Sequence, residues 1–161
     1  MRVHLGSDHA GWELKSLLAE WLVDNGHEAV DHGPGHPVPD DDYPVYCVRA
    51  AAGVAADAAA GIEALGVVIG GSGNGEQISA NKVRGIRAAL AWSEETARLA
   101  RAHNDAQVVA IGARMHTNKE VLGFVATFLA TPFSGDPRHA RRIGLLTAYE
   151  ATGELPPIPT S

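Results

Sequence analysis

Short apolar runs alternate with helical patterns along most of this chain, and this alternation limits the folds that it can adopt. The run 65–69 is continuous and rich in β-branched residues, as in a strand buried on both faces of a parallel sheet. Further strands are expected at 2–5, 27–30, 86–92 and 107–111, with helical patterns between them. This order predicts an α/β protein, a Rossmann-like three-layer sandwich whose five-stranded, mostly parallel sheet is covered by helices on both faces.

Local signals mark where several helices begin. The spacing from Thr117 to Glu120 is that of a capping box, which predicts a helix from this point to about residue 130. Asp136-Pro137 predicts an N-cap followed by proline at the first helical position, and so opens a last helix through about residue 149. A short helix is expected over 77–83, after a glycine-rich turn.

Length and composition restrict the class of protein. The 161 residues predict one domain over 1–150 and an extended tail over 151–161. The formal net charge of −6 argues against nucleic acid as a partner, because binding a phosphate backbone needs a basic face. No apolar run approaches the ~18 residues of a membrane span, and the N-terminus lacks the apolar stretch of a signal peptide, so we expect a cytoplasmic protein.

Cys47 is the only cysteine. One cysteine excludes a disulfide within the chain and a cysteine-rich zinc site. Because Cys47 lies in a helical apolar pattern, we expect it to be buried and unreactive.

The glycine-rich segment 70–77 (Gly-Gly-Ser-Gly-Asn-Gly-Glu-Gln) is the most specific motif in the chain. A dinucleotide fingerprint needs glycine where Glu76 stands, and a P-loop needs Lys-Ser/Thr after its last glycine. A nucleophile elbow needs glycine where Asn74 stands. What remains is a nest of backbone N–H groups between a buried strand and a helix, which stabilises an anion. The alternative is a tight turn that binds nothing.

Five further side chains are candidates for chemistry. Glu76 is either a partner of the helix terminus or a general base beside the anion. Arg138 and Arg142 share one helix face, which suits a phosphate, although a solvated basic face has the same pattern. His9 and His103 can transfer protons near neutral pH, or serve only in capping and packing.

A metal site is not expected. His32 and His36 lie in a segment of glycines and prolines, 32–42, and both are potential ligands. No carboxylate or cysteine pattern supports such a site, so we expect neither a metal nor a cofactor.

The motifs, taken in order, resemble a known family. They are 6–11 (Gly-Ser-Asp-His-Ala-Gly), 42–44 (Asp-Tyr-Pro), the glycine-rich segment running into 78–82 (Ile-Ser-Ala-Asn-Lys), 103–105 (His-Asn-Asp), 112–114 (Gly-Ala-Arg) and Arg138-His139-x-x-Arg142. This set is similar to type B ribose-5-phosphate isomerases, a family that includes galactose-6-phosphate isomerase subunits. The resemblance covers the chain to about residue 150.

The resemblance implies a metal-independent aldose–ketose isomerase of the non-oxidative pentose phosphate pathway, which interconverts ribose 5-phosphate and ribulose 5-phosphate through a cis-enediolate. It also implies a homodimer, or a tetramer, with active sites at the subunit interface, toward which the last helix extends. The implied catalytic residues are Glu76, His103, Asp8 and Ser72. The implied substrate-binding residues are His9, Tyr43, Gly71, Gly73, Asn74, Gly75, Asn104, Arg114, Arg138 and Arg142. Among these, His9 and the three arginines would hold the phosphate, and the glycine loop would hold the enediolate oxygen.

One position departs from many members of that family, which carry a cysteine base at the end of the third strand. Gly70 occupies this position here, and Cys47 lies elsewhere. The sequence resembles instead the branch with a glutamate in the loop, which implies that Glu76 is the base.

Three other functions stay open at this stage. The same proton chemistry serves a six-carbon sugar phosphate, such as allose 6-phosphate or galactose 6-phosphate. A non-enzymatic sugar-phosphate-binding module would use the same nest and arginines. A metal-dependent isomerase would transfer a hydride instead of a proton.

Overall fold

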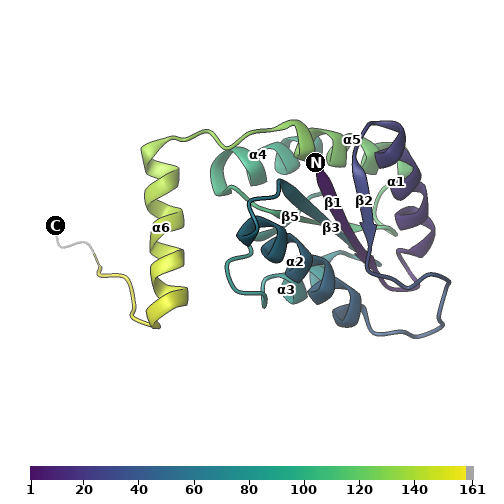
Figure 1. The fold of residues 1–161 in the computed structure, drawn as a ribbon, viewed down its shortest axis with the longest axis horizontal. Coiled ribbons are helices and arrows are strands. Elements are labelled where there is room, and N and C mark those ends of the chain that lie inside the picture. The colour runs from purple at the N-terminus through teal and green to yellow at the C-terminus, as the bar shows by residue number, and fades with distance from the viewer. Residues whose placement is uncertain (159–161) are drawn as a thin grey trace.

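Five strands form the sheet at the centre of the structure, in the order β2-β1-β3-β5-β4 (Figure 1). The structure, a computed structural model, describes residues 1–158. The strands are β1 (Arg2–Ser7), β2 (Glu28–Asp31), β3 (Ala64–Gly70), β4 (Ala88–Leu90) and β5 (Val108–Gly112). Each adjacent pair is parallel, so the described sheet is parallel throughout, where the sequence indicated a mostly parallel one.

Helices cover both faces of this sheet, which confirms the three-layer sandwich. They are α1 (Trp12–Asp24), α2 (Tyr43–Ala59), α3 (Asn74–Ala80), α4 (Glu94–Asn104), α5 (Asn118–Ala130) and α6 (Pro137–Thr152). Helices α1, α4 and α5 lie on one face, and α2 and α3 lie on the other (Figure 1). Each face has its own apolar core, because alternate side chains of the central strands point to opposite sides: Val67 and Ile69 to one core, Val68 to the other.

Helix α3 and strand β4 are among the elements that differ from their predicted bounds. Helix α3 begins at Asn74 instead of residue 77, because Gly73 adopts a left-handed conformation (φ 83°) that turns the chain directly into the helix. Strand β4 has three residues instead of seven. The bonds to the chain around β5 reach only from the Arg87 carbonyl to the Ala91 amide, because the Arg87 amide donates to the side chain of Gln107 at 2.8 Å and the amides of Trp92 and Ser93 donate to Thr96 Oγ1.

The predicted starts of α5 and α6 are confirmed. Thr117 Oγ1 accepts a hydrogen bond from the Glu120 amide at 3.3 Å, and the Glu120 carboxylate accepts one from the Thr117 amide at 2.8 Å. This reciprocal pair is the capping box. Asp136 caps α6, where its carboxylate accepts from the amide of Arg138 at 2.7 Å.

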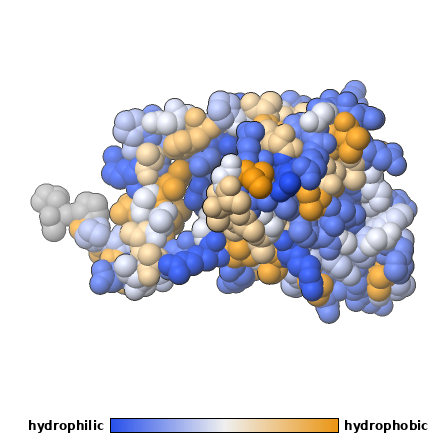
Figure 2. All heavy atoms as spheres, in the orientation of Figure 1, coloured by the Kyte–Doolittle hydropathy of each residue, from blue (hydrophilic) through white to orange (hydrophobic). Residues whose placement is uncertain are grey.

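Helix α6 projects from one side of the sandwich (Figure 1). His139 is its only buried residue, whereas Leu145, Leu146 and Tyr149 on the same helix are exposed. Figure 2 shows apolar atoms along this helix. The helix ends at Thr152 instead of residue 149. Residues 153–158 form no helix or strand, and residues 159–161 of the predicted tail lie outside the described part of the chain.

Candidate active site

Three loops that carry candidate residues meet at the carboxyl edge of the sheet. Asp8 and His9 follow β1, the glycine loop follows β3, and Arg114 follows β5. Strands β1, β3 and β5 are neighbours and run in the same direction, so their ends come together. The chain moves outward from β1 to one side and from β3 to the other, and ligands of open α/β sheets bind at such a switch point.

The glycine loop packs against the end of β5, and only small residues fit there. The amide of Ala113 donates to the Gly70 carbonyl at 2.8 Å, and that of Arg114 donates to the Gly71 carbonyl at 3.1 Å. A Cβ on Gly112 would lie 2.7 Å from the Ser72 carbonyl oxygen. Among residues 1–158, the Ser72 amide has no hydrogen-bond acceptor, so it is free for a ligand. The close packing explains why this loop contains more glycine than a simple turn requires.

Glu76 lies on α3 with only 3% of its surface exposed. Its carboxyl group occupies the space beside Gly70, where a Cβ would overlap it. Burial raises the pKa of Glu76, and the negative charge of Asp8 adds to the effect, whereas the amides of Glu76 and Gly73 oppose it. An effective general base has a pKa near the working pH, so a raised pKa makes a carboxylate a better base at neutral pH.

Asp8 is the second buried carboxylate at this edge, at 7% exposure. Its Oδ1 accepts hydrogen bonds from the amides of Ala10 at 3.0 Å and Gly11 at 3.2 Å, which fixes the side chain at the start of the turn into α1. Burial and the charges of Glu76 and Asp8 raise the pKa of the Cys47 thiol far above its ordinary value. Cys47 is therefore buried, as predicted, and its thiol stays protonated beside the two carboxylates.

Tyr43, Arg114 and His9 complete this edge. Tyr43, the first residue of α2, packs against Gly75, where a Cβ would lie 2.6 Å from the tyrosine oxygen. The Arg114 guanidinium lies alongside Gly71, and Arg114 is exposed. The structure thus gathers ten of the predicted residues at one edge: Asp8, His9, Tyr43, Gly71, Ser72, Gly73, Asn74, Gly75, Glu76 and Arg114.

The other four predicted residues lie at the opposite edge. Helix α4 runs back across the sheet from the end of β4 to the start of β5, so His103 and Asn104 lie at the amino ends of the strands. The Asn104 carbonyl accepts from Arg87, just before β4, at 2.7 Å. Asn104 and Arg142 line one pocket of about 260 Å³. A single chain therefore does not bring these residues to Glu76.

His139 joins α6 to this edge. Its ring packs on that of His103, with centroids 4.1 Å apart, and its Nδ1 lies 3.0 Å from Ser134 Oγ. Arg138 and Arg142, four positions apart, are both exposed. The basic pair is therefore open to solvent, with Arg142 at the border of the pocket that it shares with Asn104.

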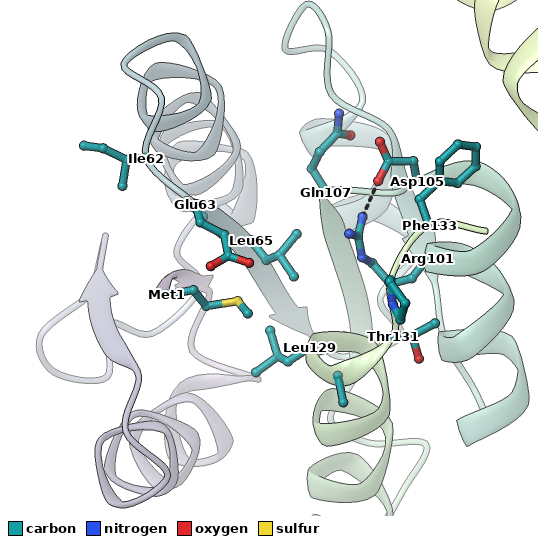
Figure 3. Close-up of a pocket in the computed structure, with 13 residues that line it drawn as sticks. Met1, Ile62, Glu63, Leu65, Arg101, Asp105, Gln107, Leu129, Thr131 and Phe133 are labelled. Carbon is teal, nitrogen blue, oxygen red and sulfur yellow. Dashed lines mark hydrogen bonds and ion pairs between the residues drawn. The ribbon is translucent and has the colours of Figure 1, made fainter. Parts of the chain in front are cut away.

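A larger pocket, about 480 Å³, also opens at the amino edge (Figure 3). Met1, Glu63, Leu129 and the ion pair between Arg101 and Asp105, 2.7 Å long, surround it. None of the predicted site residues lines this pocket. The predicted site residues therefore lie outside the larger of the two pockets.

Neither a metal cluster nor a membrane helix is found in the described part of the chain. No group of three or more histidine, cysteine, aspartate or glutamate side chains within 1–158 is arranged to hold a metal ion. His32 instead lies with its Nε2 2.8 Å from Nδ1 of His4. No helix in that range is long and apolar enough to cross a membrane.

Sequence reasoning missed Asp41. Its Oδ1 accepts hydrogen bonds from the His9 amide at 2.8 Å and from His9 Nδ1 at 2.9 Å. The run of three aspartates just before Tyr43 was a visible signal, but nothing in the sequence indicated which of them turns inward.

Known proteins resemble this chain over nearly its whole length. The family model described as Ribose/Galactose Isomerase matches residues 3–146. Ribose-5-phosphate isomerase B of Mycolicibacterium paratuberculosis is 55% identical over 99% of this chain and 98% of its own, and that of Mycobacterium tuberculosis is 55% identical over 99% and 96%.

Solved structures with the same fold include a ligand complex. Ribose-5-phosphate isomerase B of Mycoplasma genitalium with bound ribulose-5-phosphate superposes with a TM-score of 0.88 at 38% identity, covering 94% of this chain and 97% of that one. The enzyme of Clostridium thermocellum gives a TM-score of 0.86 at 38% identity, over 96% and 100%. The order of the motifs, the fold and these matches lead to one conclusion: the chain belongs to the Ribose/Galactose Isomerase family.

Proposed function

We propose that this protein is an aldose–ketose isomerase that interconverts ribose 5-phosphate and ribulose 5-phosphate. The observation that carries the proposal is the Glu76 carboxyl group, buried beside Gly70 with a raised pKa at the glycine loop. A carboxylate in this state removes a proton from carbon, and the loop amides stabilise the charge that results. The names of the relatives and the ribulose-5-phosphate complex support this choice of substrate.

The chemical step is a proton transfer. Glu76 takes the proton from C2 of the open-chain aldose, and the electron pair of that bond shifts toward the aldehyde oxygen to give a cis-enediolate. Return of the proton to C1, with transfer of the proton from the C2 hydroxyl to the C1 oxygen, leaves the ketose. The amides of 71–75 hold the enediolate oxygen, and the free amide of Ser72 supports this role.

Ring opening precedes this step. His103, Asp8 and Ser72 move protons between the ring oxygen and the anomeric hydroxyl. His9, Arg114, Arg138 and Arg142 hold the phosphate, and Tyr43 and Asn104 line the site. We assign these roles by the match of motifs to the family and by the placement of each residue at a sheet edge.

A second copy of the chain completes this site in our proposal. Asp8 and Glu76 lie at the carboxyl edge, whereas His103 and the arginines of α6 lie at the amino edge of the same chain. In a homodimer, the amino edge and α6 of one copy meet the carboxyl edge of the other. The exposed apolar side chains of α6 support an interface there. We further propose that the enzyme works in the cytoplasm, in the pentose phosphate pathway and without a metal.

The decisive experiment follows isomerisation of ribose 5-phosphate in deuterated water by NMR. The wild-type protein should form ribulose 5-phosphate and incorporate solvent deuterium at C2 of the recovered aldose. Glu76→Gln should lose about 10²–10⁴-fold in kcat with little change in KM. The exposed Glu13→Gln is the matched control and should keep wild-type kinetics. Near-normal kcat in Glu76→Gln would remove Glu76 from the mechanism, and no deuterium exchange in the wild type would refute proton transfer.

A further inference from the structure

Asp41 and His9 form a tight pair at the edge of the candidate site. One carboxylate oxygen of Asp41 accepts from both the amide of His9, at 2.8 Å, and the ring Nδ1, at 2.9 Å. The Asp41 side chain is only 5% exposed, whereas that of His9 is 34% exposed. The carboxylate therefore lies behind the imidazole, which faces outward.

The pair fixes which nitrogen of His9 is available. Burial opposes ionisation of Asp41, but the amide and the ring of His9 together hold the pKa of the carboxyl below its ordinary value. An ionised carboxylate only accepts, so Nδ1 of His9 carries the proton between them. Nε2 is the ring nitrogen left for a ligand, and no group within 1–158 hydrogen-bonds to it.

The conformation of the loop 40–43 directs the Asp41 side chain toward His9. Asp40 adopts a left-handed conformation (φ 56°), which is uncommon for residues other than glycine and which aspartate and asparagine adopt more readily than most. Two residues after Asp41, Tyr43 begins α2 and packs against Gly75 of the glycine loop. One short segment thus supports both the imidazole after β1 and the wall of the glycine loop.

We propose that Asp41 is a positioning residue that acts through His9: it holds the imidazole with Nδ1–H turned inward and Nε2 presented to the phosphate of the substrate. The inference rests on the phosphate-binding role of His9 in the proposed function. The Asp41 charge also offsets the positive charge of an imidazolium, the form of this ring that donates from Nε2 to a phosphate oxygen.

The phosphate is bound alike in the ground state and the transition state. Removal of Asp41 or His9 should therefore raise KM and leave kcat nearly unchanged. His9→Ala and Asp41→Ala should each raise KM by about 10-fold, the size expected for one charged hydrogen bond. Asp41→Asn keeps an acceptor oxygen for both His9 donors but loses the charge, so it should raise KM by about 3-fold. The control Asp40→Asn removes a neighbouring exposed charge from a position that asparagine tolerates, and KM should not change.

A double-mutant cycle distinguishes positioning from general stabilisation of the fold. If Asp41 acts through His9, adding Asp41→Ala to His9→Ala should change KM by less than about 2-fold. Inorganic phosphate, used as a competitive inhibitor and as a calorimetric ligand, should show the same pattern without reliance on turnover. In ¹⁵N NMR of the imidazole, Nδ1 should carry a proton in the wild type both in the neutral ring and in the imidazolium that binds phosphate, and Asp41→Ala should remove this preference in the neutral ring.

The results separate this inference from the proposed function. Additive effects of the two substitutions, a kcat loss as large as the KM change in Asp41→Ala, or unchanged phosphate affinity in His9→Ala would each overturn the positioning role in an enzyme that still isomerises the sugar. Absence of isomerisation by the wild-type protein would overturn the proposed function, and the phosphate and NMR measurements would still test Asp41.

Discussion

The two edges of the sheet are built in opposite ways. At the carboxyl edge, Glu76 and Asp8 are buried, and the glycine loop is packed so closely that added side chains would collide with it. At the amino edge, Asn104, Arg138 and Arg142 are exposed. Helix α6 has one buried residue, His139, and a second contact through Glu150, whose carboxylate accepts from the Gly85 amide at 3.0 Å. In the proposed function, the carboxyl edge would hold Glu76 in a rigid frame, while the amino edge would present His103 and the arginines of α6 to a second copy of the chain.

Gly70→Ala, a substitution at the rigid carboxyl edge, should cause the largest loss of activity among the following variants. The added Cβ overlaps the end of the Glu76 side chain, so the fold can remain while the carboxyl group moves. We expect a loss of about 10²-fold in kcat, since a small displacement of a base costs much of its effect. Gly35→Ala, where a Cβ would meet nothing within 4 Å, is the control. Wild-type kcat in Gly70→Ala would mean that this placement of the carboxyl group is unimportant.

Arg142→Ala tests the exposed edge and should have a smaller effect of a different kind. Loss of a phosphate contact should raise KM by about 10-fold and leave kcat nearly unchanged. Arg141→Ala removes a neighbouring exposed charge that the site does not use, and should leave both constants as they are. Equal effects of the two substitutions would indicate a nonspecific influence of charge.

Thermal unfolding should show opposite contributions to stability from Asp57 and Glu76, two carboxylates whose pKa values shift in opposite directions. A hydrogen bond from His4 and the charge of Arg2 hold the pKa of Asp57 below 3.8, so this group stabilises the fold above that pH and the contribution is lost as pH falls through the lowered value. The pKa of Glu76 is raised above 4.5, so its ionised form costs stability at neutral pH and the cost disappears in acid.

At pH 7, Asp57→Asn should therefore lower the Tm, and Glu76→Gln should raise it, each by roughly a few degrees. Both differences should shrink toward pH 3. Shifts of the same sign at pH 7, measured by calorimetry, would contradict the assigned environments.

Removal of metal should have the smallest effect. Proton transfer by Glu76 with charge stabilised by amides requires no metal ion, so dialysis against a chelator should leave kcat within about 2-fold of the untreated enzyme. Loss of activity that added Mg²⁺ or Zn²⁺ restores would favour the hydride-shift alternative.

The sequence indicated most of the fold, and the resemblance implied a site shared between subunits, but neither showed that His103 and Asn104 lie at the edge opposite Glu76. Hydrophobic periodicity located the five strands and the helices, because burial on one or two faces leaves a direct trace in the order of residues. The predicted ends of β4 and α3 were wrong. Hydrogen bonds to the side chains of Gln107 and Thr96 limit β4, and the conformation of Gly73 sets the start of α3.

Contacts between residues far apart in the chain could not be predicted from the sequence. Motif order could not reveal that Glu76 fills the space beside Gly70, since that contact depends on how α3 packs against β3. Nor could it single out Asp41 among three consecutive aspartates, because a backbone turn at Asp40 directs it toward His9.

Mixing two impaired variants tests most directly whether a second copy completes the site. Glu76→Gln protein and Arg138→Ala/Arg142→Ala protein are combined, subunit exchange is verified by mass spectrometry, and isomerisation is measured at a substrate concentration below the wild-type KM, where the arginine variant alone is nearly silent. A mixed dimer has one site with an intact Glu76 facing intact arginines, so an equal mixture should recover about one quarter of wild-type activity. No recovery after complete exchange would contradict the account and would place all site residues within one chain.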